Sequence, residues 1–207
     1  MFALPKLIYR NKLNLPSLPP QGTFKDQTIL ITGASGGLGL ATAVHFVNLG
    51  AASVIITTRT AEKGAAAKAT IETQTGTTGK DVVKIMELDM STFEGIKDFA
   101  DRVKKEVKVI DYVLLNAGLF NTSFKMGKEG FEETVEVNCI STTLLALLLL
   151  PWIKENGRGQ AHLGFVTSGL HRCKWLILHK QAFPVLTHSS HRHKPRKMAT
   201  RTCPSLL

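Results

Sequence analysis

The chain has 207 residues, 43% of them hydrophobic, which suffices for one α/β domain with a sizeable core. The formal net charge is +10, but nine of the 26 Lys and Arg residues, and no acidic residue, lie after residue 155. The remaining 17 basic side chains nearly balance the 16 acidic ones, which argues against specific nucleic-acid binding by the domain. Three cysteines without metal-ligand or disulfide spacing predict a reduced, cytoplasmic setting.

The N-terminal residues 1–27 include the segment NLPSLPPQG and are predicted to form an arm on the surface. They lack the long apolar region and small-residue cleavage site of a signal peptide. The most apolar stretch, residues 144–150, meets Pro151 and is far shorter than the roughly 20 residues of a membrane span. We therefore predict no membrane span.

Residues 28–39, TILITGASGGLG, predict a buried strand, a glycine turn and the start of a helix that ends near Gly50. In this interpretation Gly33 permits the turn, Gly37 lets the backbone approach a pyrophosphate, and Gly39 lets the helix pack closely on the strand. Amides at the helix N-terminus would face the phosphates. A glycine turn with a purely structural role is the alternative. The turn residues expected to bind a nucleotide are Gly33, Ser35, Gly37, Leu38 and Gly39.

Strands and helices alternate along the rest of the domain. Apolar or β-branched runs predict strands at 53–58, 82–88, 109–115 and 161–167. Helical spacing predicts helices at 61–75 and 131–151 and, behind a capping box formed by Ser91 and Glu94, a helix that includes residues 96–107. This order predicts an α/β fold, a doubly wound parallel sheet with helices on both faces and strand 1 beside strands 2 and 4. Five polar residues would then meet at one sheet edge as a binding cleft: Thr32, Arg59, Asp89, Asn116 and Ser168.

With these residues placed, the chain resembles the short-chain dehydrogenase/reductase family over about residues 24–169. TGASGGLG matches the family pattern T-G-x-x-x-G-x-G, and Asn116-Ala117-Gly118 is similar to its N-A-G motif. The resemblance implies a Rossmann-type domain at 28–169 that transfers hydride between a nicotinamide dinucleotide and a carbonyl or alcohol. It is closest to reductases of fungal natural-product pathways.

Two residues fall at catalytic positions of this family. Ser168 would hydrogen-bond the substrate oxygen, and Asn138 would hold a water of the proton relay, as the resemblance implies. The family's general acid, a tyrosine followed four residues later by lysine, is expected near residues 180–182, where none occurs. The two tyrosines present are Tyr9, in the arm, and Tyr112, which we expect to be buried in a strand away from the cleft. A catalytically inactive, NADP-binding remnant or regulatory protein is therefore the alternative function.

Residues 170–207 contain no acidic residue and no clear period, and predict an aberrant, largely disordered basic tail. We hypothesise a change of reading frame or splicing just after Ser168. A Tyr-x-x-x-Lys in another frame of the gene would support this, and its absence from all frames would refute it. The sheet would be incomplete on its C-terminal side, with an edge strand at 161–167 and exposed core residues at Leu115, Leu163 and Phe165.

The cofactor preference follows from the end of the second strand, where an acidic residue would select NAD. Arg59 stands there instead, with Lys63 one helical turn later and the Ser35 hydroxyl in the glycine turn, a set that suits the 2′-phosphate of NADP. Solvated surface charges are the alternative for Arg59 and Lys63. By resemblance Asp89 would pair with the adenine amino group, or else flank the next helix. Asn116 and Gly118 would contact the cofactor, or else only end a strand.

Two further features carry weaker predictions. The histidines of the segment 188–193 lie among cations with no acid or cysteine to complete a shell, so we predict no metal site. The helix at 131–151 is apolar nearly all round and is interpreted as core or as a homo-oligomer interface.

Overall fold

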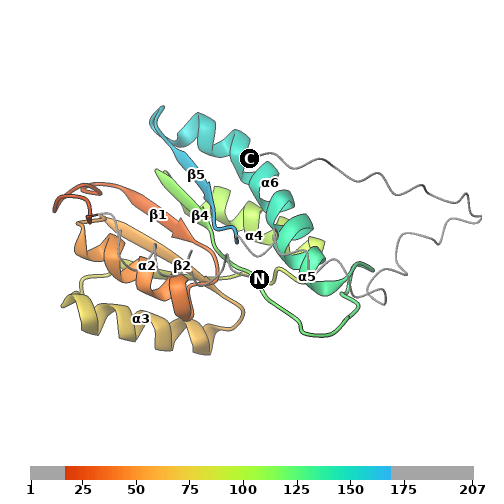
Figure 1. The fold of residues 1–207 in the computed structure, drawn as a ribbon. Helices are drawn as coiled ribbons and strands as arrows, with labels where there is room; N and C mark the ends of the chain where they lie inside the picture. The colour runs from red at the N-terminus through yellow and green to blue at the C-terminus, as the bar shows by residue number, and fades with distance from the viewer. Residues whose placement is uncertain (1–16, 169–207) are drawn as a thin grey trace, which may run out of the picture.

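The computed structural model describes residues 17–168, and within them a parallel five-stranded sheet forms the centre of the domain (Figure 1). The strand order is β3-β2-β1-β4-β5, so β1 lies between β2 and β4 as predicted. The doubly wound, Rossmann-type α/β fold is therefore confirmed. The elements are β1 (Thr28–Ile31), α2 (Gly37–Asn48), β2 (Ser53–Thr58), α3 (Ala61–Thr75), β3 (Val83–Glu87), α4 (Phe93–Glu106), β4 (Tyr112–Leu115), α5 (Glu133–Val135), the π-helix η1 (Glu136–Ser141), α6 (Thr142–Asn156) and β5 (His162–Phe165).

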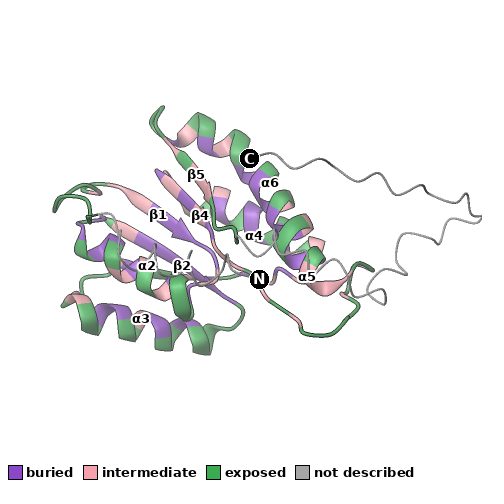
Figure 2. Ribbon diagram, viewed as in Figure 1, coloured by how far each residue is buried: buried purple, intermediate pink, exposed green. Residues whose placement is uncertain are grey.

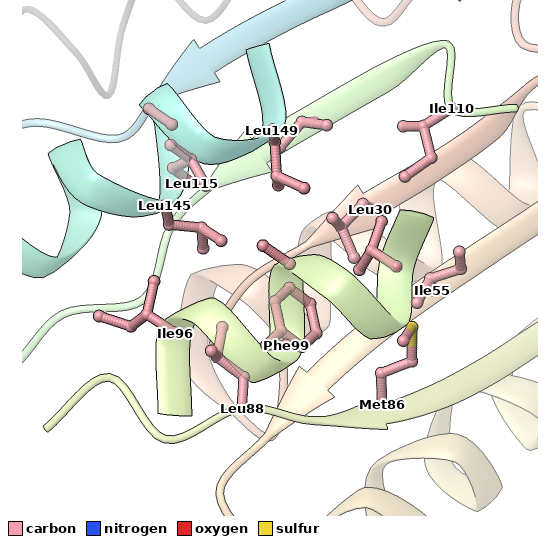
Figure 3. Close-up of a cluster of buried hydrophobic side chains, with 14 of the residues drawn as sticks. Leu30, Ile55, Met86, Leu88, Ile96, Phe99, Ile110, Leu115, Leu145 and Leu149 are labelled. Atoms are coloured by element: carbon pink, nitrogen blue, oxygen red, sulfur yellow. The ribbon is translucent and has the colours of Figure 1, made fainter. Parts of the chain in front are cut away.

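Helices cover both faces of the sheet, and each face has its own core. Successive residues of a strand point to opposite faces. Accordingly Ile29 of β1 packs with α2 and α3, whereas Leu30 packs with α4 and α6. Figure 3 shows Leu30, Phe99 of α4 and Leu145 of α6 pointing into one buried cluster between the sheet and these helices. All three side chains are fully buried, and burial of each stabilises the fold by about 1.5–3 kcal/mol.

The strand β5 is the edge of the described sheet and pairs with β4 alone. Phe165 is 49% exposed and Leu163 is half-buried, as expected for an uncovered edge (Figure 2). The expectation for Leu115 is wrong, because its side chain is only 2% exposed. Leu145 and Leu149 of α6 belong to the same cluster and cover Leu115, so the exposed region is confined to the edge strand.

The long apolar helix begins at Glu133 and continues through Pro151 to Asn156 instead of ending at the proline. Pro151 lies on the exposed side of α6, where the carbonyl left without its N–H partner can bind water. By length and composition Glu133–Asn156 could cross a membrane, but 44% of the window is buried inside the domain. Its buried face, which includes Leu149, packs against α4 as a core helix does.

Tyr112 lies at the amino end of β4, at the opposite edge of the sheet from the strand ends that carry the polar residues. It is half-buried, not buried as expected, and its ring packs against Phe46 at 5.9 Å and Phe24 at 6.3 Å. Phe24 thus ties part of the predicted arm to the domain. The remaining arm residues 1–16 and the predicted tail at 170–207 lie outside the described residues.

Candidate functional site

The turn after β1 needs glycine at two positions. Gly33 has φ +68°, and a Cβ atom there would lie 2.7 Å from the Cα of Ala117. A Cβ atom on Gly39 would lie 2.6 Å from Nδ2 of Asn116 and equally close to the carbonyl oxygen of Gly33. The absence of side chains therefore lets the turn pack against the segment that follows β4. Gly37 has φ +55° but faces open space, so its Cβ would meet nothing within 4 Å.

The amino end of α2 is open. The helix begins at Gly37, whereas helical spacing predicted a start after Gly39. Its cap residue, Gly36, makes no side-chain capping hydrogen bond, and the first turn carries no acidic residue. The backbone N–H groups of this turn and the positive end of the helix dipole are thus available to an anion.

Hydrogen bonds hold the glycine turn to the end of β4. The side-chain amide of Asn116 donates to the carbonyl oxygens of Thr32, at 3.0 Å, and Gly33, at 3.2 Å. The buried Thr32 hydroxyl oxygen accepts hydrogen bonds from the backbone N–H groups of Asn116 and Ala117, both at 2.9 Å. Asn116 is therefore a structural clamp of the turn as well as a residue facing the cleft.

A cleft of about 370 Å³ runs along the carboxyl ends of β1, β2, β3 and β4. Nine of the ten residues predicted to bind the cofactor line it: Gly33, Ser35, Leu38, Gly39, Arg59, Lys63, Asp89, Asn116 and Gly118. Gly37 is the tenth and lies outside the lining. The sequence interpretation missed several lining residues, among them Met90, Leu119, Glu133 and Val137.

Asp89 closes the cleft wall after β3. Its Oδ1 accepts hydrogen bonds from the backbone N–H of Ser91 at 2.9 Å and from the Ser91 hydroxyl at 2.6 Å. Its Oδ2 lies 3.3 Å from Nζ of Lys128. Burial alone would raise the pKa of Asp89, but the hydrogen bonds from Ser91 and the Lys128 ammonium outweigh it and lower the pKa.

The capping box predicted from Ser91 and Glu94 is wrong. Thr92 is the cap residue of α4, and its hydroxyl oxygen accepts a hydrogen bond from the N–H of Gly95 at 3.1 Å. Ser91 instead donates to Asp89 and forms the turn that precedes the helix. Asp89 thus flanks the start of α4, which is the alternative role expected for it from the sequence.

Opposite charges face each other across the cleft. Arg59 and Lys63 are exposed at the end of β2 and the start of α3, and Glu133 lines the same cleft from α5. Glu133 accepts hydrogen bonds from Lys125 and Asn121, both at 2.8 Å. The Lys125 hydrogen bond, then that of Asn121 and more weakly the charge of Arg59, lower the pKa of Glu133. Glu133 gave no sequence signal, because an acidic residue in a first helical turn is common.

The two candidate catalytic residues lie outside the cleft lining. Asn138, in the π-helix, accepts from the N–H of Leu119 at 2.9 Å and donates to its carbonyl at 2.7 Å. A Cβ atom on Gly118 would lie 3.1 Å from Oδ1 of Asn138, so this region is closely packed. Ser168 is exposed and lies three residues beyond the end of β5. Within residues 17–168, no three His, Cys, Asp or Glu side chains are grouped to hold a metal ion.

Residues 27–170, about two thirds of the chain, match the family model described as short chain dehydrogenase. The chain belongs to the short-chain dehydrogenase family. A short-chain dehydrogenase/reductase of Phaeosphaeria nodorum, phmF, is 42% identical over 75% of this chain and 47% of its own length. Another, ffsI of Aspergillus flavipes, is 39% identical over 74% of this chain and 46% of its own length. This short-chain dehydrogenase chain therefore spans less than half the length of these curated relatives.

Solved short-chain dehydrogenases share the fold. One from Escherichia coli CFT073, in complex with NADPH, is 30% identical with a TM-score of 0.61 and covers 74% of this chain and 63% of its own. One from Shigella flexneri, in complex with NADP, is 29% identical with the same TM-score and the same coverage of both chains.

Proposed function

We propose that this chain binds NADP(H) in the cleft and forms the cofactor-binding part of an oxidoreductase that interconverts a small carbonyl compound and its alcohol. The observation that carries the proposal is the cleft itself, in which nine of the ten predicted cofactor residues meet from four strand ends. Two solved relatives that contain NADPH and NADP support the choice of cofactor.

The residues around the cleft fit both the pyrophosphate and the 2′-phosphate of NADP(H). The open amino end of α2 offers backbone N–H groups to the pyrophosphate, and the free space at Gly37 lets it approach the backbone. Arg59 and Lys63 offer positive charge to a 2′-phosphate, and the position directly after β2 holds Arg59 in place of an acidic residue that would repel it. When bound, the nicotinamide ring would supply or accept the hydride.

The chain's own residues would orient the carbonyl and the proton. The Ser168 hydroxyl would hydrogen-bond the substrate oxygen, and the Asn138 amide would hold a water for the proton relay. A carbonyl that gains hydride becomes an alkoxide and needs a proton donor with a pKa near the working pH. No tyrosine follows Ser168 in this sequence, so the residue that serves as proton donor in the family is missing.

This absence favours a second candidate function, NADP(H) binding without efficient catalysis, as a remnant or a regulatory partner. The first test is NADPH oxidation by the purified full chain with a panel of ketones. Slow but reproducible turnover above that of solvent controls supports the oxidoreductase, and bound NADPH without turnover supports the second candidate. Failure to bind NADPH refutes both.

Setting and assembly are further parts of the proposal. The relatives in Phaeosphaeria nodorum and Aspergillus flavipes are fungal short-chain dehydrogenases/reductases. A place in fungal secondary metabolism is proposed on the resemblance of the motifs, and a cytoplasmic setting on the cysteine usage of the sequence. Leu147 and Leu150 of α6 are 62% and 47% exposed, which supports a homo-oligomer contact through this helix. Light scattering of the wild-type chain and of a Leu147→Lys variant tests the contact, and a wild-type monomer would refute it.

A further inference from the structure

Glu136 is a buried acidic residue that the proposed function does not use. It is the first residue of the π-helix and is 0% exposed. Its Oε1 accepts a hydrogen bond from the backbone N–H of Lys128 at 3.0 Å. Its Oε2 accepts from the N–H groups of Glu129, at 3.0 Å, and Phe131, at 3.3 Å. Such a carboxylate fixes the loop that carries the donors, because its loss would leave buried amides unpaired.

The loop closes tightly around this carboxylate. A Cβ atom on Gly127 would overlap both carboxylate oxygens of Glu136, so a side chain there would push the carboxylate away from its donors. The N–H of Gly127 donates to the carbonyl of Phe131 at 2.7 Å, and the N–H of Glu133 donates to that of Lys125 at 2.8 Å. Residues 125–133 therefore form a short hairpin, and the buried carboxylate of Glu136 occupies the inside of its turn.

Two side chains of the hairpin reach the connection between β3 and α4. Nζ of Lys128 lies 3.3 Å from Oδ2 of Asp89. Oε1 of Glu129 accepts a hydrogen bond from the N–H of Phe93, the first residue of α4, at 2.7 Å. Because residues 88–91 line the cleft, the hairpin braces one wall of it.

We propose that Glu136 is a positioning residue for the nucleotide cleft, acting through Lys128 and Glu129 to hold Asp89 and the start of α4 in place. The inference rests on the proposed function, because its consequence is the affinity for NADP(H). Glu136 itself does not line the cleft, so its effect must pass through the hairpin. The following residue, Val137, does line it, so the π-helix contributes directly to the wall that the hairpin braces.

A double-mutant cycle on the full-length chain tests this inference. Glu136→Gln keeps the shape of the side chain but places an amide group against backbone donors. Lys128→Met removes the contact with Asp89 while keeping the stem, and the 62% exposure of the Lys128 side chain means that no cavity forms. Glu155→Gln, an exposed carboxylate on α6, is the matched control. The measurements are NADPH affinity by titration and hydrogen exchange of the amides.

We expect Glu136→Gln to weaken NADPH binding by about tenfold and Lys128→Met by about threefold. In the Lys128→Met background, Glu136→Gln should reduce NADPH affinity by a smaller factor. The reason is that the contact of Lys128 with Asp89, one of the two contacts through which Glu136 acts, is already removed. Hydrogen exchange at residues 128, 129 and 131 should accelerate in Glu136→Gln alone. The control should change neither measurement.

Three results would overturn the inference. The first is unchanged NADPH affinity in Glu136→Gln and Lys128→Met when the unsubstituted chain binds. The second is full additivity of the two substitutions. The third applies if Glu136→Gln does not fold: the test then uses Lys128→Met and Glu129→Gln, and unchanged NADPH affinity in both variants overturns the inference. Absence of NADPH binding by the unsubstituted chain would instead refute the proposed function, and this inference with it.

Discussion

Gly33 and Ala117 are in backbone contact: a Cβ atom added to Gly33 would lie only 2.7 Å from the Cα of Ala117. The turn after β1 therefore packs directly against the segment after β4. Gly33→Ala should therefore destabilise the fold by about 2 kcal/mol or more, from the clash and from its φ of +68°. Gly76→Ala is the matched control, because Gly76 has φ +64° and open space around it. Denaturant unfolding measures both, and an equal loss in the two variants would contradict the contact.

Arg59 should set the preference between the two dinucleotides. Arg59→Asp should weaken NADPH by about tenfold or more and leave NADH nearly unchanged, because only NADPH carries a 2′-phosphate. Lys97→Asp, the same charge reversal at an exposed site on α4, controls for net charge. Equal losses for NADPH and NADH in calorimetry would show that the 2′-phosphate assignment is wrong.

Catalysis should be far slower than in a complete enzyme of the family. A general acid or base typically contributes about 10² to 10⁴-fold, and the expected tyrosine is absent. We expect at most a trace of ketone-dependent NADPH oxidation. Rapid turnover that Ser168→Ala abolishes would contradict this expectation and would show that another group of the chain supplies the proton.

The pH dependence of stability should carry a contribution from Asp89. Its folded pKa is lowered from the ordinary value of 3.8, so the charged form is favoured by folding. The stabilisation is then fully present above that value and is lost as the pH falls through the lowered pKa. Asp89→Asn should be less stable than the wild type at pH 6, and the difference should shrink as the pH falls through the lowered pKa of Asp89. A difference that persists unchanged to low pH would contradict the assignment.

The strands were predictable because each is a short apolar run bounded by turn residues. Residues 53–58 were placed with their correct bounds, since β-branched residues fill the strand and Arg59 ends it. Helix boundaries were harder. Glycine has low helix propensity, so spacing alone placed the start of α2 after Gly39, whereas Gly37 begins the helix. Thr92 and Ser91 are both good caps, and only the tertiary contact of Ser91 with Asp89 decides between them.

The candidate site divides in the same way. Its glycine turn follows a spacing that geometry requires, and three of the five predicted strand-end polar residues, Arg59, Asp89 and Asn116, line the cleft. The other two, Thr32 and Ser168, do not. Glu133 and Glu136 were not predictable, because an acidic residue near a helix start is usually a solvated one. The π-helix at Glu136–Ser141 could not be predicted from the sequence either, since its period differs from 3.6 and it has no characteristic composition.

Calorimetric titration of NADPH into the purified chain and its Gly37→Asp variant tests the central claim most directly. Aspartate tolerates the left-handed backbone at φ +55° better than most residues, so the variant should fold, but its carboxylate would meet the pyrophosphate. Gly159→Asp, at φ +73° with open space and outside the cleft lining, is the matched control. We predict saturable binding of one NADPH by the wild type and the control, and none by Gly37→Asp. Equal binding by all three proteins, or none by the wild type, would contradict NADP(H) binding in this cleft.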